Sequence, residues 1–283
     1  MRILVLGKTG MLGHVVYNYF KENDYEVFGT TTKEGTLQYD AYNNLEKIED
    51  IITEIKPDVI VNCIGILNQV CEDNKVLAVK LNSLLPHYLD SLSTKYNFKF
   101  IHISTDCVYE GKKGKYDESS QPDATSFYGR SKALGEVKNT NSVTLRTSIV
   151  GPDANPKGIG LFQWFMNQEN TVGGYTKVIW TGVTTIELAK QIEVAIKNNI
   201  TGLNHVVNND FISKKDLLEL FKKYFNKNIE ITNNDKVISE KTLIKTDASY
   251  NFDVPSYEKM VEEMRDWVIA HQELYPNIKV EVK

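Results

Sequence analysis

The sequence is poor in cysteine, histidine and proline, and it has no excess of positive charge. Its 283 residues include 3 cysteines, 5 histidines and 7 prolines, and 33 basic against 37 acidic residues leave a net charge of −4. Cys63, Cys71 and Cys107 form no CxxC pair and are too few for a disulfide framework, so we expect free thiols in a reducing cytoplasm. Nucleic-acid binding by phosphate neutralisation needs a basic face, which this composition does not favour.

Long apolar runs are also missing. A membrane-spanning helix needs about 20 apolar residues in a row, and no run approaches that length. The apolar opening stops at Gly7, which is too short for a secretory signal. The histidines form no HxxxH or HExxH arrangement, so we expect no metal site. A hydrophobic share of 41% is ordinary for a folded protein, and we expect a cytoplasmic globular protein that acts neither on nucleic acid nor in a membrane.

Short apolar runs alternate with segments of helical period through the first half of the chain. Pro86 lies inside one of these helical segments and should kink it or shift its start. Strands alternating with helices of this length predict a Rossmann-type α/β fold with a doubly wound parallel sheet. The expected strands are 2–6, 25–30, 58–63, 98–104 and 143–148, and the expected helices are 11–21, 45–55, 76–96 and 126–137.

The alternation of strands and helices becomes less regular after Gly151, where a Pro/Gly-rich loop covers 151–160. We expect helices at 184–197, 213–225 and 256–274, and surface loops in the Lys/Asn-rich stretch 221–241. The length of the chain favours about two domains. We assign an NAD(P)-binding Rossmann domain to residues 1–150, together with about 184–208, and a smaller C-terminal α/β substrate domain to 151–183 and 209–283.

The first expected strand runs directly into a glycine turn, and a helix follows at once. Gly7, Gly10 and Gly13 would allow a tight turn, a close approach to a pyrophosphate, and packing of helix on strand, in that order. Free N–H groups at the start of the helix would face the phosphates. Glycine turns also close helices for structural reasons, but the position between strand and helix favours dinucleotide binding. The intervening residues are assigned to the same site: Lys8, Thr9, Met11 and Leu12.

The second expected strand ends in hydroxyl groups and a lysine, in the sequence GTTTK at 29–33. An NAD-specific site usually has Asp or Glu there to hold the ribose 2′-hydroxyl. Thr30, Thr31 and Lys33 suit a 2′-phosphate better, which favours NADPH and leaves NADH as the alternative. A polar loop without a ligand is the competing interpretation. Further cofactor contacts are expected at Asp40, Ala41, Cys63, Ile64 and Gly65.

Hydroxyl groups also follow the strand at 98–104, at the edge where open parallel sheets bind ligands. Ser104, Thr105 and Asp106 lie there, and further on Tyr128 and Lys132 are spaced to share one face of a helix. Tyrosine has an ordinary pKa of about 10, and a nearby ammonium would lower that pKa. A lone YxxxK is common by chance. Together with the glycine turn and the STD strand end, it predicts proton transfer to a carbonyl that is being reduced.

These motifs resemble those of the extended short-chain dehydrogenase/reductases, and most closely the dTDP-4-dehydrorhamnose reductase type. The segments VLGKTGMLG, VNCIG, HISTDCVYEG, YGRSKALGE and LRTSIVG carry the resemblance over 1–151, and it continues more loosely to about residue 225. The resemblance implies that Tyr128 donates the proton, that Lys132 lowers its pKa and binds the nicotinamide ribose, and that Thr105 holds the keto oxygen. Ser104 or Asp106 would assist. The implied reaction reduces the 4-keto group of a nucleotide-linked 4-keto-6-deoxyhexose, in rhamnose-type deoxysugar and polysaccharide biosynthesis.

The chain departs from that family pattern on the sugar side. Cys107 replaces a tyrosine, Ile149 replaces an aromatic residue, and Gly182-Val183-Thr184 lacks the usual proline. The identity of the substrate is therefore left open: it is either a dTDP-linked hexose or a UDP-linked 2-acetamido sugar. We assign Ile149 and Trp180 to its pocket. The nucleotide sugar is the expected partner, and a homodimer is left open. Two alternatives remain: an epimerase or dehydratase on the same scaffold, and a non-catalytic NADP-binding subunit resembling the regulatory subunit of methionine adenosyltransferase.

Overall fold

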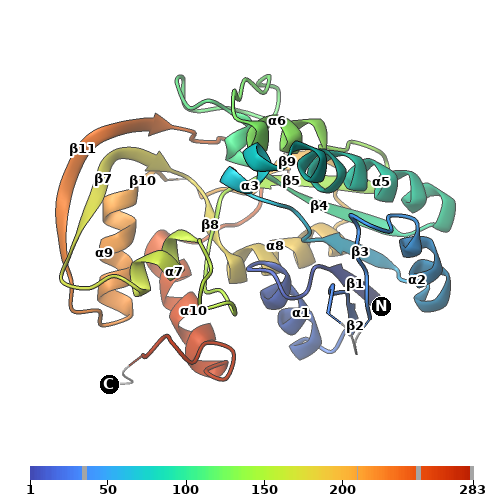
Figure 1. Ribbon diagram of the computed structural model, residues 1–283, viewed down its shortest axis with the longest axis horizontal. Helices are drawn as coiled ribbons and strands as arrows, with labels where there is room; N and C mark the ends of the chain where they lie inside the picture. Colours follow the sequence, from blue (N-terminus) through green and yellow to red (C-terminus); the bar gives the residue numbers. More distant parts are fainter. Residues whose placement is uncertain (34–36, 209, 247–249, 281–283) are drawn as a thin grey trace.

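A computed structural model describes residues 1–33, 37–208, 210–246 and 250–280 (Figure 1). Its centre is a six-stranded parallel sheet with the order β2-β1-β3-β4-β5-β9. This sheet confirms the predicted fold class. The strand order reverses between β1 and β3, and ligands of such sheets bind at that point. The strands are β1 (Arg2–Leu6), β2 (Glu26–Gly29), β3 (Val59–Asn62), β4 (Lys99–Thr105), β5 (Ser142–Thr147) and β9 (Gly202–His205).

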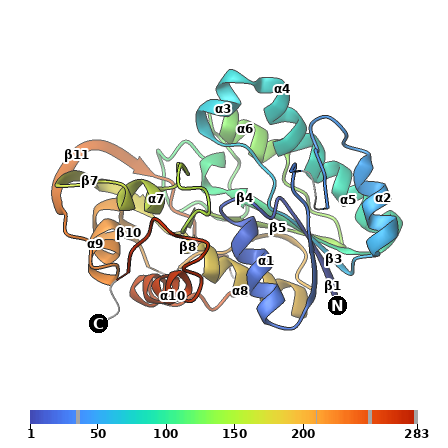
Figure 2. The same ribbon diagram turned by 60° about the horizontal axis from the view of Figure 1, so that its bottom comes forward.

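Helices cover both faces of this sheet (Figures 1 and 2). On one face α1 (Gly13–Glu22) packs beside α8 (Thr185–Lys197), and on the other lie α2 (Lys47–Ile55) and α5 (Leu85–Tyr96). Neighbouring residues of β1 enter different layers: Val5 packs in the core with α1, whereas Leu4 packs in the core with α2. Because both faces are buried, the strands appear in the sequence as continuous apolar runs.

The helix expected over 76–96 runs without a break from Lys75 to Tyr96, but part of it is π-helical. It consists of α4 (Lys75–Ala78), a π-helical turn η1 (Val79–Leu84), and α5, and the short helix α3 (Asn68–Asp73) precedes it. Pro86 is the second residue of α5, which follows the π-helical turn directly. A shift of the helix start to Pro86 is therefore not what the structure shows, because residues 75–96 are helical without a break, and the π-helical turn is an addition that the sequence did not predict.

A second, three-stranded sheet lies beside the first, with the order β10-β7-β11. It consists of β7 (Thr171–Trp180), β10 (Ile212–Ser213) and β11 (Glu230–Glu240), and it is accompanied by α7 (Leu161–Met166), α9 (Lys214–Tyr224) and α10 (Tyr257–Ala270). The surface loops predicted within 221–241 are wrong for 230–240, because these residues form β11. Its side chains are mostly exposed and show no apolar alternation, and the strand is held by main-chain pairing with β7.

Serine or threonine hydroxyls cap several helices in the second half of the chain. In each case the hydroxyl accepts a hydrogen bond from the backbone N–H three residues later, which satisfies one of the free donors of the first turn. These caps explain why the helices begin where they do. The capped helices are α6 (Phe127–Leu134), α8, α9 and α10, and the capping residues are Ser126, Thr184, Ser213 and Ser256. Within the described part of the chain, no helix is long and apolar enough to cross a membrane.

The C-terminal segment packs against the start of α1. His14 Nδ1 lies 2.9 Å from the Gly10 carbonyl oxygen, which can only accept, so Nδ1 carries the proton. His14 Nε2 therefore accepts from the Tyr275 hydroxyl at 2.6 Å, and that hydroxyl accepts from Trp267 Nε1 at 3.0 Å. This chain of hydrogen bonds connects α10 to the glycine turn.

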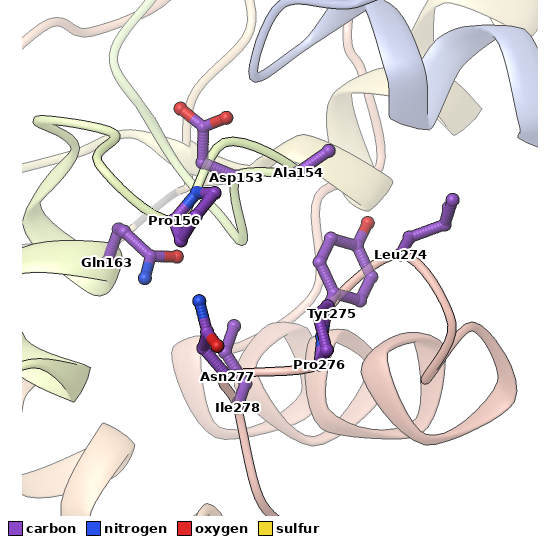
Figure 3. Close-up of a pocket in the computed structure, with 9 residues that line it drawn as sticks. All are labelled: Asp153, Ala154, Pro156, Gln163, Leu274, Tyr275, Pro276, Asn277 and Ile278. Atoms are coloured by element: carbon purple, nitrogen blue, oxygen red, sulfur yellow. The ribbon is translucent and has the colours of Figure 1, made fainter.

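A small cavity lies next to this chain of hydrogen bonds, between the loop after β6 (Ile149–Val150) and residues 274–278 (Figure 3). Asp153, Pro156 and Gln163 line one side of it, and Tyr275 and Ile278 line the other. Its volume of about 10 Å³ is enough for one water molecule at most. The cavity is therefore a packing gap and not a ligand site.

Candidate active site

The glycine turn has the shape of a phosphate cradle. Gly7 has φ +77°, and a Cβ on Gly13 would lie 2.1 Å from the Gly7 carbonyl oxygen, so α1 can start against the turn only with glycine there. A Cβ on Gly10 would meet only ordinary contacts, and Gly10 and Thr9 are exposed to an approaching ligand. Met11 is partly exposed and Leu12 is buried below. This geometry fits the pyrophosphate of a dinucleotide.

At the end of β2 the hydroxyl groups of the two predicted threonines already accept hydrogen bonds from backbone N–H groups. Thr30 and Thr31 are buried; Thr30 Oγ1 accepts from the Gly7 N–H at 3.2 Å, and Thr31 Oγ1 accepts from the Lys33 N–H at 3.2 Å. Lys8 lies across the same strand end, because a Cβ on Gly29 would be 2.5 Å from its Cδ. Lys8 therefore brings positive charge to the place where the sequence predicts a 2′-phosphate, and the exposed Lys33 follows nearby in the chain.

The other predicted cofactor residues lie around this turn. Ile64 Cγ1 would be 3.0 Å from a Cβ on Gly7, so 63–65 border the glycine turn. Burial raises the pKa of the Cys63 thiol to about 12, which makes it a neutral packing group. The Asp40 carboxylate accepts hydrogen bonds from the Tyr42 and Asn43 backbone and from the Asn43 side chain, and the Asn43 side chain contributes most to holding its pKa below the usual range. Ala41 is buried.

Thr105 and Tyr128 are brought together by a close contact between α6 and the loop after β4. A Cβ on Gly129 would lie 2.1 Å from the Cys107 carbonyl oxygen, so α6 packs directly on the 3₁₀ turn η2 (Asp106–Val108). Tyr128 is thereby placed next to Thr105. Burial raises the pKa of Tyr128 above its ordinary value, and a hydrogen bond with the Thr105 hydroxyl opposes this shift. The phenol is therefore protonated at neutral pH.

Lys132 lies one helical turn further along α6, buried in the protein. Its Nζ donates a hydrogen bond to the Ile103 carbonyl oxygen at 2.7 Å. Burial lowers the pKa of Lys132 to about 8, and Glu136 opposes the shift. The sequence predicts that Lys132 lowers the pKa of Tyr128; this stays a prediction, and burial outweighs any such effect in this structure. The pKa of Tyr128 is raised because burial dominates.

The predicted substrate residues are divided between two environments. Ser104 is buried, and its hydroxyl donates to Glu136 Oε1 at 2.7 Å, away from Thr105. Asp106 is partly exposed and accepts from the Thr105 hydroxyl at 3.1 Å. Ile149 is partly exposed, and Trp180, at the end of β7, is 3% exposed. Trp180 thus belongs to the second sheet and Asp106 follows a strand of the first, whereas Ser104 belongs to the interior.

Sequence reasoning missed the residue that supports α6 from behind. Asn82, in the π-helical turn η1, is completely buried. Its Nδ2 donates to the Ile66 carbonyl at 3.0 Å and to the Ser131 hydroxyl at 3.1 Å, and its Oδ1 accepts from the Ile66 N–H. Ser131 lies between Tyr128 and Lys132 on α6, so Asn82 fixes the position of that helix. The available signal was an asparagine inside an expected helix, where it is unfavourable unless its side chain has specific partners.

A buried ion pair lies beneath Ser104. Arg146 and Glu136 are almost fully buried, and Arg146 Nε donates to Glu136 Oε1 at 2.8 Å while Nη2 donates to Oε2. Arg146 Nη1 also donates to the Tyr109 hydroxyl at 2.6 Å and lies 3.0 Å from His205 Nε2. The network joins the ends of β4, β5 and β9 below the candidate active site.

The fold, the glycine turn and the Thr105–Tyr128–Lys132 group place the protein in the class of extended short-chain dehydrogenase/reductases. More specifically, the chain belongs to the RmlD substrate binding domain family, whose family model matches residues 1–228.

Known proteins similar to this chain include both reductases and a subunit of methionine adenosyltransferase 2. A 159-residue segment is 30% identical to methionine adenosyltransferase 2 subunit beta of Xenopus laevis, covering 54% of this chain and 48% of that protein, so the chain spans about half of that relative's length. It is 27% identical over 235 residues to a probable low-salt glycan biosynthesis reductase of Haloferax volcanii, covering 77% of this chain and 78% of that protein. The crystal structure of dTDP-4-dehydrorhamnose reductase from Bacillus anthracis in complex with NADP has a TM-score of 0.79 at 20% identity, covering 93% of this chain and 98% of that one. This last likeness is one of fold.

Proposed function

We propose that this protein is an NADPH-preferring reductase that converts the 4-keto group of a nucleotide-linked 4-keto-6-deoxyhexose to an alcohol, in the cytoplasm. The observation that carries the proposal is the contact of Thr105 with a protonated Tyr128 at the carboxyl edge of the sheet, beside a buried Lys132. The family and the Haloferax volcanii relative support it. Residues 1–150 with about 184–208 would bind the cofactor, and 151–183 with 209–283 would bind the sugar nucleotide.

The side chains of the site would act on the keto oxygen of the substrate, first by holding it and then by protonating it. NADPH, when bound, supplies the hydride to the keto carbon. Thr105 would hold the keto oxygen with its hydroxyl, and Tyr128 would donate its proton to the alkoxide that forms. The raised pKa of Tyr128 suits this role, because a proton donor must be protonated before the reaction. Lys132, with a pKa of about 8, is mostly cationic at neutral pH and would stabilise the phenolate left behind.

The direct test is NADPH oxidation, followed by absorbance, with a panel of dTDP- and UDP-linked 4-keto-6-deoxy sugars. The panel should include members with a hydroxyl and members with an acetamido group at C2, since the substrate is open on this point. We expect turnover with at least one of them. Absence of turnover with every member would rule out the proposed reaction.

NADPH should bind more tightly than NADH, because Lys8 and Lys33 bring positive charge to the end of β2. A charge-assisted contact contributes about 1.5–3 kcal/mol at best, so Lys8→Met or Lys33→Met should reduce the ratio of affinities about 10- to 100-fold at most, and less for the exposed Lys33. Calorimetric dissociation constants for both cofactors measure this ratio. Lys21→Met is the matched control, since Lys21 is exposed in the last turn of α1, away from the glycine turn. Equal affinities for NADPH and NADH in the wild type would contradict the prediction.

A second candidate function is that of a non-catalytic regulatory subunit, favoured by the 30% identity to methionine adenosyltransferase 2 subunit beta. On this alternative the protein would bind NADPH, reduce no keto-sugar, and elute together with a methionine adenosyltransferase in size-exclusion chromatography. The reductase predicts turnover and no such complex. An epimerase or dehydratase would be recognised by NAD that stays bound through purification.

A further inference from the structure

A surface groove lies between the loop before α2 and the π-helical turn η1. Its volume is about 280 Å³, close to the roughly 300 Å³ at which pockets for drug-sized ligands begin, and a nucleobase is smaller than such ligands. The loop lines it with residues 41–46, among them the buried Ala41 and the partly exposed Leu45. From the other side η1 contributes Lys80 and Leu84, and Leu84 is 47% exposed. The groove therefore combines apolar walls with one cation.

Lys80 connects the two walls of this groove. Its Nζ donates a hydrogen bond to the Tyr42 carbonyl oxygen at 3.2 Å and lies 4.6 Å from the centre of the Tyr42 ring. An ammonium group has three N–H donors. Because the Lys80 side chain is partly exposed, the donors that Tyr42 does not use can reach a ligand in the groove.

The carboxylate of Asp40 shapes the loop side of the groove. Its Oδ1 accepts from the N–H groups of Tyr42 and Asn43, and its Oδ2 accepts from the Asn43 side chain at 2.7 Å. These hydrogen bonds fix the turn that places Ala41 and Tyr42 along the groove. Asp40 therefore acts on the shape of the loop, and Lys80 supplies a hydrogen-bond donor to the space beside it.

The π-helical turn η1 separates this groove from the helix that carries Tyr128. The Ser83 hydroxyl donates to the Ser131 carbonyl oxygen at 2.7 Å, and Asn82 Nδ2 donates to the Ser131 hydroxyl at 3.1 Å, so this side of η1 faces α6. Lys80 extends from η1 to the loop instead. The groove and Tyr128 therefore lie on opposite sides of η1.

The glycine turn lies close to the same π-helical turn. A Cβ on Gly7 would be 3.0 Å from Ile64 Cγ1, and a Cβ on Gly65 would be 3.3 Å from the Oδ1 of Asn82 in η1. A dinucleotide with its pyrophosphate at the glycine turn extends in two directions from there. If its nicotinamide is directed to Tyr128, its adenine is directed to the side of η1 on which the groove lies.

We propose that this groove binds the adenine of the cofactor, with Lys80 donating a hydrogen bond to a ring nitrogen and Leu84 packing on a face of the ring. Adenine has flat apolar faces and ring nitrogens that accept hydrogen bonds, which match the leucines and the ammonium. Sites of this kind are mostly apolar, with a few polar groups that fix the orientation of the ligand. The identity of the cofactor rests on the proposed function.

Dissociation constants of NADPH and NADH, measured by calorimetry on the full chain, test this proposal. Lys80→Met removes the charge and keeps an unbranched side chain, and Leu84→Ala removes an apolar wall without changing any charge. The matched control is Lys75→Met, because Lys75 is exposed in the same helical segment, lies 5.8 Å from the ring centre of Phe127 and does not line the groove. Thermal unfolding of each variant checks that it is folded.

Both cofactors carry adenine, so Lys80→Met should weaken the binding of NADPH and NADH by the same factor. We expect about 10-fold, and at most about 100-fold, for a lost hydrogen bond from a charged group. Leu84→Ala should also weaken both equally, about 3- to 10-fold for the lost apolar contact. Adenosine 2′,5′-bisphosphate, which carries adenine but no nicotinamide, should show the same two losses. Lys75→Met should change no affinity.

Three outcomes would overturn the proposal. A loss in Lys80→Met for NADPH but not for NADH would assign Lys80 to the 2′-phosphate. A loss for both cofactors in Lys80→Met, with none in Leu84→Ala, would assign Lys80 to the pyrophosphate, and unchanged affinities in both variants would leave the groove without any part of the cofactor. Failure of the proposed reduction is a separate result, since it appears as absent NADPH oxidation while the cofactor affinities keep the expected pattern.

Discussion

Replacing Tyr128 with phenylalanine should lower kcat for keto-sugar reduction about 10²–10⁴-fold, the usual contribution of a positioned acid. The ring would still pack against η2, so the fold and the cofactor site should survive while the transferable proton is gone. NADPH affinity should change little, because the phenol is expected to act on the substrate. Initial rates and calorimetric dissociation constants for NADPH separate the two effects. Full turnover in Tyr128→Phe would mean that another group donates the proton.

Lys132→Ala provides the comparison for this variant. Lys132 is proposed to bind the nicotinamide ribose as well as to stabilise the phenolate, so its removal should weaken NADPH binding and also lower kcat. In the double variant the losses of rate should not add, because both residues act on one proton transfer. Additive losses would instead indicate two independent steps.

The largest effect on stability is expected for Arg146→Met. Removing one partner of a buried ion pair leaves an uncompensated charge, which costs about 3–5 kcal/mol. Here the charge left behind belongs to Glu136, which would keep only the Ser104 hydroxyl of its described side-chain partners. The free energy of unfolding from urea titrations measures the loss.

Two further variants show whether this loss comes from the stranded charge. The double variant Glu136→Met with Arg146→Met should be more stable than Arg146→Met alone, because the Glu136 carboxylate is no longer left without its Arg146 partner. Lys95→Met removes the exposed partner of Glu49 and should leave the free energy of unfolding nearly unchanged. If the double variant were no more stable than the single one, packing and not charge would explain the effect.

The main sheet could be predicted because its strands are buried on both faces. The expected strand 2–6 coincides with β1, and the glycine turn and the Thr105–Tyr128 contact follow from the order of strands and helices. By contrast, β11 could not be predicted, since its pairing with β7 depends on main-chain groups and its side chains remain exposed.

The details of the candidate site needed three-dimensional information. Ser104 and Thr105 are adjacent on β4, and adjacent residues of a strand point to opposite faces, which is why Ser104 turns to Glu136. That alternation was available in the sequence. The raised pKa of Tyr128 was not, because it depends on how much of the phenol the rest of the fold covers. The contact of Asn82 with α6 could not be predicted for a similar reason, since it depends on a π-helical turn, which has no reliable sequence pattern.

The hydrogen-bonded chain from Trp267 through Tyr275 to His14 limits how this protein can be divided. The family model ends at residue 228, yet the apolar side of α10 completes the same core that contains Val5 and Val15 of the first elements. A chain shortened to residue 228 would lose that side and the hydroxyl that holds His14 beside the glycine turn. The first elements of the main sheet are thus not an excisable module: α1 is braced by a tyrosine that lies 261 residues after His14 in the sequence, and we expect α1 to acquire its final position only after that tyrosine has been synthesised.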